Sequence, residues 1–180
     1  MTSIMNYDDS TETEKRKAAF LFEMNSQSDR GVAIVGAAWV ENALMTTIKS
    51  FLHSESKAWV DFTEGNSPLS SFSAKIDLAR LLGIITETIR LDLHDIRRVR
   101  NDFAHQIAHK TEHTILDFNS SDISKKCMVL KCVAHQNHTE PRKSFIYACW
   151  KLAWEFEMFH LFGAKVSSDG AHIFADVERH

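Results

Sequence analysis

The sequence is poor in the residues that interrupt helices or cross-link chains. Its 180 residues include only six glycines, two prolines and three cysteines. So few glycines and prolines fit long, uninterrupted helices. The cysteines are odd in number and lack zinc-site spacing, which predicts reduced thiols and a cytoplasmic location. No apolar run approaches the length of a membrane span, and no signal peptide, Gly-rich phosphate loop or Ser-centred nucleophile elbow is evident. We therefore expect no membrane contact and no cofactor.

Neither positive nor negative charge is present in large excess. The formal net charge is −3 with histidine neutral, and the chain is 44% hydrophobic and 25% charged. This acidic balance argues against a protein that coats DNA without specificity, although it leaves room for a local basic site. The length fits one helical domain over residues 1–180, with 1–10 and 165–180 loosely ordered.

The most informative stretch is residues 86–109, in which apolar residues recur at spacings of three and four. This is the pattern of an amphipathic helix, with Thr86 as a plausible N-cap. At about 100° per residue, His94, Asn101 and His105 share the opposite, polar face. The apolar positions are Ile89, Leu93, Ile96, Val99, Phe103 and Ile107.

Arg100 falls inside the apolar arc of this helix, where an unpaired guanidinium would be costly. A second helix, expected over residues 30–52 and capped by Asp29, is apolar nearly all round and carries Glu41 at its centre. A carboxylate in such a place needs a counter-charge or several hydrogen bonds. We therefore predict a structural ion pair between Glu41 and Arg100.

The remaining chain also reads as helical. Ser70 or Ser71 caps one expected helix, and Thr139 caps the last, which ends before Gly163. That last helix has more aromatic residues than one core stripe needs. They either face another subunit or are wedged between two layers of the same domain. Further expectations are helices over 15–24, 72–82 and 139–162, a connection over 53–70, a short extended piece over 114–118, and helix rather than strand over 126–134.

Two family resemblances follow from these residues. The string Arg100-Asn101-Asp102-Phe103-Ala104-His105 resembles the R-x4-6-H motif of HEPN domains, which are helical and usually dimeric. The stretches 28–44, 67–85, 92–105 and, more weakly, 116–118 resemble the mannitol operon repressor (MtlR) family. The implied fold is an all-α, HEPN-like or MtlR-like bundle with long central helices.

The HEPN resemblance implies a metal-independent endoribonuclease, toxin-like or defence-like, with its site at a homodimer interface. In that hypothesis His105 transfers protons, Arg100 stabilises phosphate charge, and Asn101 orients His105 or the phosphate. Arg97 and Arg98 would hold flanking RNA phosphates, or else form a solvated basic face. The MtlR resemblance implies instead a transcriptional regulator acting through protein partners or weak DNA contact, although no helix-turn-helix is evident. An antitoxin or a regulatory protein is a possible partner.

The positions of Arg100 and His105 on the helix limit the nuclease hypothesis. Arg100 and His105 lie about 140° apart on a helical wheel, so one regular helix cannot easily aim both at one phosphate. Either the site is shared between two protomers or the helix distorts. Metal alternatives are weaker, because His105 and His109 lack a third ligand, and His135 and His138 beside Cys132 fit a solvated loop better than a zinc site.

Overall fold

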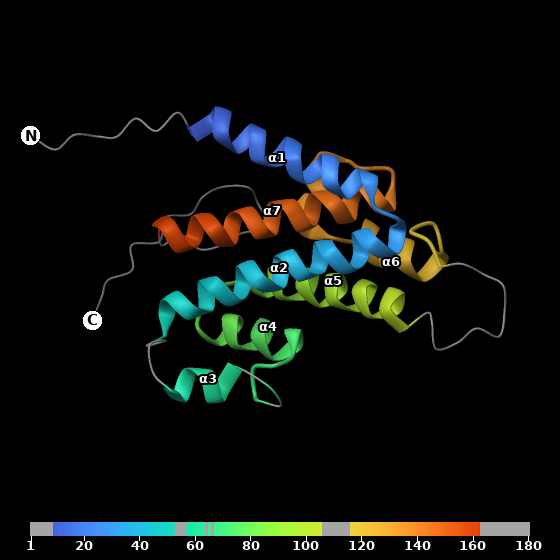
Figure 1. The fold of residues 1–180 in the computed structure, drawn as a ribbon. Helices are drawn as coiled ribbons and strands as arrows, with labels where there is room; N and C mark the ends of the chain where they lie inside the picture. Colours follow the sequence, from blue (N-terminus) through green and yellow to red (C-terminus); the bar gives the residue numbers. More distant parts are fainter. Residues whose placement is uncertain (1–8, 53–56, 64, 66, 106–115, 163–180) are drawn as a thin grey trace, which may run out of the picture.

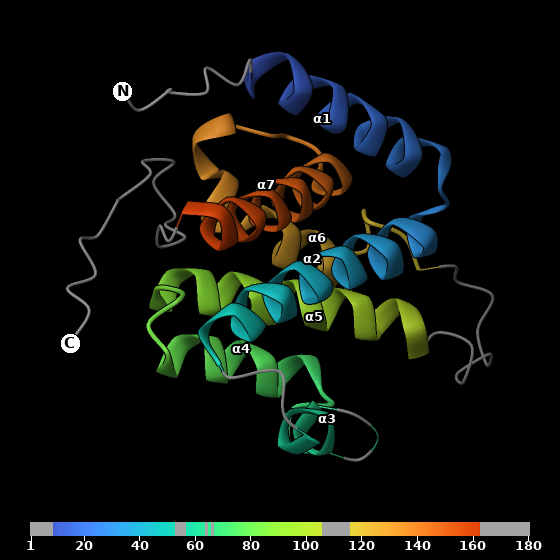
Figure 2. The same ribbon diagram turned by 60° about the vertical axis from the view of Figure 1, so that its left-hand side comes forward.

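Helices make up nearly all of the chain that the structure, a computed structural model, describes: residues 9–52, 57–63, 65, 67–105 and 116–162. No strand occurs among these residues, so the predicted all-α class is confirmed. Figures 1 and 2 show the bundle from two sides. Its elements are α1 (Asp9–Ser26), α2 (Asp29–Phe51), α3 (Lys57–Thr63), α4 (Phe72–Leu81), α5 (Glu87–His105), α6 (Ser121–Met128), the 3-10 helix η2 (Lys131–Gln136) and α7 (Pro141–Phe162).

The central helix is α2, which packs against α1, α4, α5 and α7. Its composition explains this position, because apolar residues cover most of its circumference, and Val32, Val40 and Leu44 are completely buried. Gly36 marks the closest approach to α7. A Cβ added there would lie 3.1 Å from Cys149 Sγ and 3.3 Å from Phe145 Cε1. Glycine therefore lets these two helices pack tightly.

The N-terminus of α2 is tied to two distant parts of the chain. Ser28 caps the helix by accepting a hydrogen bond from Gly31 N (3.2 Å). The N-cap of α2 is therefore Ser28, whereas the sequence predicted Asp29. The Asp29 carboxylate instead accepts a bond from Phe118 N (3.1 Å) and pairs with Arg142 Nε (3.0 Å). One carboxylate consequently joins the starts of α2 and α7 to the turn before α6.

The aromatic helix α7 lies inside its own domain, in contact with α1, α2, α6 and η2. Phe145, Phe156 and Phe159 are buried, and Trp150 is half-buried against the core. The second of the two interpretations therefore accounts for the aromatic excess, and no second subunit is needed to explain it.

Several predicted boundaries are wrong. The first helix begins at Asp9 rather than residue 15, and the predicted connection over 53–70 contains α3. The stretch 126–134 is divided between α6 and η2. The last helix begins at Pro141, so Thr139 is not its cap. Residues 116–118 form no strand, and 106–115, 1–8 and 163–180 lie outside the described residues.

The expectation that no segment is long enough to span a membrane also needs correction. By length and composition alone, α2 is long and apolar enough to do so. The same composition suits a core helix, and half of its apolar window is buried inside the bundle. Packing against four other helices gives a sufficient reason for its apolar character.

Candidate functional site

Arg100 lies on α5 and is held by two neighbours. Its Nη2 is 3.5 Å from Glu41 Oε2, and its Nη1 donates to Asn101 Oδ1 at 3.0 Å. The side chain is 37% exposed, so the guanidinium lies at the edge of the core and not within it. The sequence placed Arg100 deeper, because a helical wheel cannot show where the neighbouring helices end.

Glu41 has a closer partner than Arg100. Lys75 Nζ on α4 donates to Glu41 Oε1 at 2.6 Å, and both side chains are mostly buried. Lys75 was not among the predicted site residues. A signal was available, because Lys75 falls at helical spacing between Phe72 and Ala79, both of which are buried. Two cations on two helices therefore converge on one carboxylate of the central helix.

His105 lies on the last turn of α5, and it is exposed. Asn101 is one turn earlier, and its side-chain oxygen is already engaged by Arg100. The α-helix is unbroken from Glu87 to His105, so the 140° wheel offset between Arg100 and His105 is not removed by a distortion. A nuclease site would have to draw its arginine and histidine from two protomers.

The two other predicted RNA contacts differ from each other. Arg98 is exposed and pairs with Asp95 Oδ1 at 2.7 Å, one turn earlier on the same helix. Arg97 is half-buried, and its Nε is buried with no hydrogen-bond partner among the described residues. Both arginines lie near Arg100 along α5, yet their surroundings within the domain are not alike.

His94 does not share the open polar face that the wheel predicted for it. It is 8% exposed, because α4 packs over this part of α5. Burial lowers the pKa of His94, while Asp77, with Oδ1 at 3.4 Å from its Nε2, opposes that effect. His94 is therefore separated in environment from Asn101 and His105.

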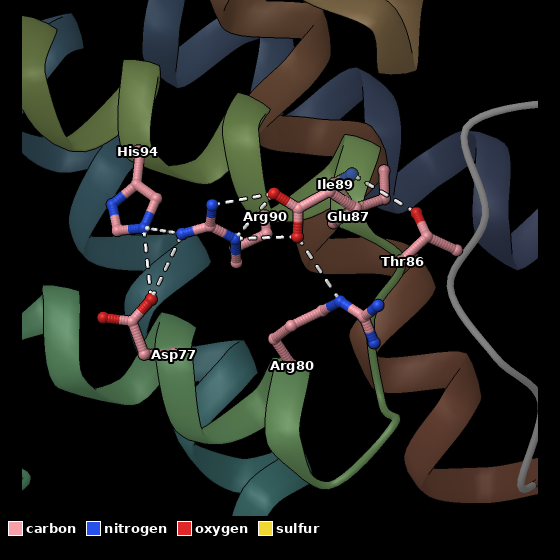
Figure 3. Close-up of polar contacts among 7 residues, drawn as sticks. All are labelled: Asp77, Arg80, Thr86, Glu87, Ile89, Arg90 and His94. Atoms are coloured by element: carbon pink, nitrogen blue, oxygen red, sulfur yellow. Dashed lines mark hydrogen bonds and ion pairs between the residues drawn. The ribbon is translucent and has the colours of Figure 1, made fainter.

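A charged network surrounds His94 between α4 and α5 (Figure 3). Arg90 Nη2 donates to Glu87 Oε1 at 2.7 Å, and Arg90 Nη1 lies 3.1 Å from His94 Nε2. Asp77 and Arg80, both on α4, complete the network through Arg90 and Glu87 respectively. The Arg90 guanidinium lowers the pKa of Glu87. This network was not predicted, because its members lie on two helices and a helical wheel describes one helix at a time.

Metal binding finds no support in the described part of the chain. No group of three or more His, Cys, Asp or Glu residues there is arranged to hold a metal ion. His138 stacks on Tyr147 with ring centroids 4.6 Å apart, and its Nε2 lies 2.7 Å from Gln136 Oε1. The three cysteines are free and buried, and burial raises the pKa of Cys127 to about 12. Its thiol is therefore protonated at neutral pH.

Comparison with known proteins gives one informative match. No family model and no curated protein matches the sequence. Among solved structures, a chain of the "X-ray structure of the MtlR-HPr complex from Escherichia coli" superposes with a TM-score of 0.62. The match covers 81% of this chain and 98% of that chain, at 16% sequence identity. This chain has an MtlR-like fold.

The MtlR-like fold confirms the resemblance at the level of architecture and no further. At 16% identity, a structural likeness carries the fold without the activity. The resemblance of Arg100 to His105 to the HEPN motif stays a prediction, as do the homodimer, the RNA substrate and the cytoplasmic location.

Proposed function

We propose that this protein is a non-enzymatic regulator that acts by binding a protein partner. The fold likeness supports this, because the matching MtlR-like chain comes from a structure of a protein–protein complex. HPr, the protein named in that complex, is accordingly the first partner to test. An acidic net charge and the absence of an evident helix-turn-helix favour a protein partner over DNA.

The state of Arg100 is the observation that carries this proposal. In the nuclease hypothesis its guanidinium must be available to a phosphate, yet within the domain it contacts Glu41 and Asn101. Glu41 also holds Lys75, so these residues join α2, α4 and α5. A phosphate would have to compete with a carboxylate that is fixed in the fold. The arrangement favours a structural role for Arg100.

The surface that best fits a protein partner is the α4–α5 face, defined by Arg80, Leu81, Glu87, Arg90 and Leu91. Leu81 is 84% exposed at the end of α4, and Leu91 is half-exposed one turn after Glu87. Protein interfaces commonly combine exposed apolar side chains with arginine, and burying the leucines would give the apolar contribution. Charges of both signs in the network of Figure 3 would fix the register of the partner.

Calorimetric titration with HPr from the same organism tests this proposal. We expect the double variant Leu81→Ser/Leu91→Ser to weaken binding by about ten-fold or more, because it removes the apolar centre of the face. The matched control is Phe22→Ser on α1, which removes a side chain that is 80% exposed and remote from the α4–α5 face. We expect the control to bind like wild type. Absence of HPr binding by wild type, or an equal loss in both variants, would contradict the proposal.

A second candidate is the metal-independent endoribonuclease, favoured by the exposure of His105 one turn beyond Asn101. Cleavage of RNA in the presence of EDTA by wild type, but not by His105→Ala, would support it. His135→Ala is a matched control, because it removes an exposed histidine from η2, a different part of the fold. Equal RNA degradation by wild type and His105→Ala would attribute the activity to a contaminant.

A further inference from the structure

Three polar atoms form a triangle where α4 meets α5. His94 Nε2 lies 3.1 Å from Arg90 Nη1 and 3.4 Å from Asp77 Oδ1 (Figure 3). Arg90 Nη1 lies 3.4 Å from the same Asp77 oxygen. Which sides of this triangle are hydrogen bonds depends on whether His94 Nε2 carries a proton, because an imidazole nitrogen donates with its proton and accepts without it.

The neutral ring fits the triangle as it stands. An arginine side chain has only donors, so Arg90 Nη1 donates and His94 Nε2 accepts, and the single ring proton lies on Nδ1. Arg90 is also held by Glu87, whose Oε1 accepts from Arg90 Nη2 at 2.7 Å. In this state Arg90 is fixed between His94 and Glu87.

A proton on His94 Nε2 reverses the role of that atom. It would then donate to Asp77 Oδ1, and two cationic donors would face each other where Arg90 Nη1 and His94 Nε2 now lie 3.1 Å apart. Like charges repel, and Arg90 is the freer of the two to move, since its side chain is 28% exposed and that of His94 11%. Arg90 should therefore turn its Nη1 toward solvent while it stays paired with Glu87.

The charges that act on His94 come from α4 and from α5 itself. Asp77 of α4 favours the protonated ring, whereas Arg90 and Arg97 of α5 oppose it. The other elements in contact with α5 are α2, α6 and η2, and among the described residues none of their charged groups forms a hydrogen bond or ion pair with His94. Their ionisable side chains pair with other residues or are exposed: Glu41 with Arg100, Lys126 with Asp102, and the exposed Lys131 and His135.

We propose that this triangle is a pH-sensitive switch, in which protonated His94 exchanges Arg90 for Asp77 as its partner and releases Arg90 toward the α4–α5 face. The switch operates in mild acid, because burial lowers the pKa of His94. A released guanidinium can donate to an acidic group of a protein partner, so the face binds such a partner more tightly in acid. This effect on a partner rests on the proposed function, whereas the exchange within the triangle does not.

NMR of the imidazole rings in the purified protein tests the exchange between pH 5 and pH 8. The His94 signals are those that the variant His94→Gln lacks. Long-range proton–nitrogen correlations show which ring nitrogen carries the proton. We expect it on Nδ1 alone at pH 8 and on both nitrogens at pH 5. A proton on Nε2 at pH 8 would mean that Arg90 does not donate to this atom, and it would overturn the proposal.

Two variants test the partners that the exchange assigns to His94. Asp77→Asn removes the anion that the protonated ring meets, and it should lower the midpoint of the His94 titration by about one pH unit. Arg90→Gln removes the opposing cation and should raise the midpoint. The control is Asp122→Asn, which removes an exposed carboxylate from the first turn of α6 and should leave the midpoint unchanged. Equal midpoints in wild type and Asp77→Asn, or an equal shift in Asp122→Asn, would overturn the proposal.

Calorimetric titration with HPr at pH 5 and pH 8 then tests the effect on a partner. The gain in affinity on going to pH 5 should be about three-fold larger for wild type than for His94→Gln, which has no ring to protonate. The comparison with His94→Gln removes the pH dependence of HPr itself. An equal pH response in both proteins would contradict the link between His94 and the α4–α5 face. Absence of HPr binding at both pH values would contradict the proposed function instead, and the NMR midpoints would still decide whether the exchange occurs.

Discussion

The two ends of α5 contain similar residues in different surroundings. Near its start, Asp92 and His94 are buried beneath η2 and α4 respectively. Near its end, Asp102 and His105 lie at the surface, and Asp102 pairs with Lys126 of α6 at 2.6 Å. The same two residue types thus serve the fold at one end and are available to solvent or a ligand at the other.

Asp92 shows what burial does to a carboxylate on this helix. It accepts hydrogen bonds from Lys131 N at 3.0 Å and Cys132 N at 2.7 Å, and so caps η2. Burial nevertheless raises the pKa of Asp92, because desolvation outweighs the two backbone bonds. Asp102 has no comparable task. The chemical type of a residue therefore predicts its role poorly until the neighbouring elements are placed.

The largest expected effect comes from removing these two aspartates in turn. We expect Asp92→Ala to lower the free energy of unfolding by about 3–4 kcal/mol, because two buried backbone N–H groups lose their acceptor. Asp102→Ala should cost less than about 1 kcal/mol, because its ion pair is partly exposed. Urea denaturation followed by circular dichroism measures both. Similar costs for the two variants would show that the ends of α5 are not distinct.

A pH titration sharpens the comparison, because a further buried carboxylate lies near η2. Lys151 Nζ donates to Cys132 O at 2.9 Å and lies 3.5 Å from Glu155 Oε1. Burial raises the pKa of Glu155 to about 7, although Lys151 opposes the shift. The unfolded chain therefore loses this proton at lower pH than the folded chain does. Stability should fall as the pH rises from about 4.5 to 7, by at most about 3 kcal/mol.

Glu155→Gln is the variant that isolates this group. It should remove that part of the pH dependence and be more stable than wild type at pH 8, since glutamine cannot ionise. Denaturant midpoints at pH 5 and pH 8 provide the measurement. An unchanged slope in Glu155→Gln would mean that Glu155 stays ionised in the fold at both pH values.

Periodicity explains why part of this fold could be predicted. The buried positions of α5, among them Ile89, Leu93 and Phe103, follow the spacing that the sequence displays. The apolar circumference of α2 likewise predicted its central place. These features are properties of a single helix, and one helix at a time can be evaluated from sequence.

The candidate sites depend on how helices meet, which periodicity does not contain. The wheel grouped His94 with His105, but α4 packs over His94, whereas His105 on the last turn is exposed. Lys75 was missed because periodicity does not show which cation of a neighbouring helix meets Glu41. Phe20 of α1 likewise packs on Trp39 of α2 and Trp150 of α7, and the sequence contains no signal for that contact beyond the apolar character of Phe20.

Removing the carboxylate of Glu41, which pairs with Lys75 of α4 and Arg100 of α5, should have an intermediate effect on stability. Glu41→Gln leaves Lys75 and Arg100 without their shared counter-charge, and we expect a loss of about 1–2 kcal/mol in the free energy of unfolding. The double variant Glu41→Gln/Lys75→Met should recover part of that loss, because it removes one unpaired cation. If the single variant is as stable as wild type, the Glu41 ion pairs do not contribute to the fold, and Arg100 is freer for a ligand than its contacts indicate.

The smallest expected effects come from the two histidines. His94→Gln should cost about 1 kcal/mol, because the buried ring fits against α4 and lies 3.1 Å from Arg90 Nη1, whereas His105→Gln should change stability by less than about 0.5 kcal/mol. His94 also contributes to the pH dependence of stability. Because burial lowers the pKa of His94, the unfolded chain gains a proton at higher pH than the folded chain, so this group makes the protein less stable as the pH falls below about 6.5. Thermal unfolding between pH 5 and pH 8 should therefore show a shallower slope on the acid side for His94→Gln than for wild type. A larger loss of stability in His105→Gln than in His94→Gln would mean that His105 contributes to the fold. The exposure of His105 would then not indicate a site open to a ligand.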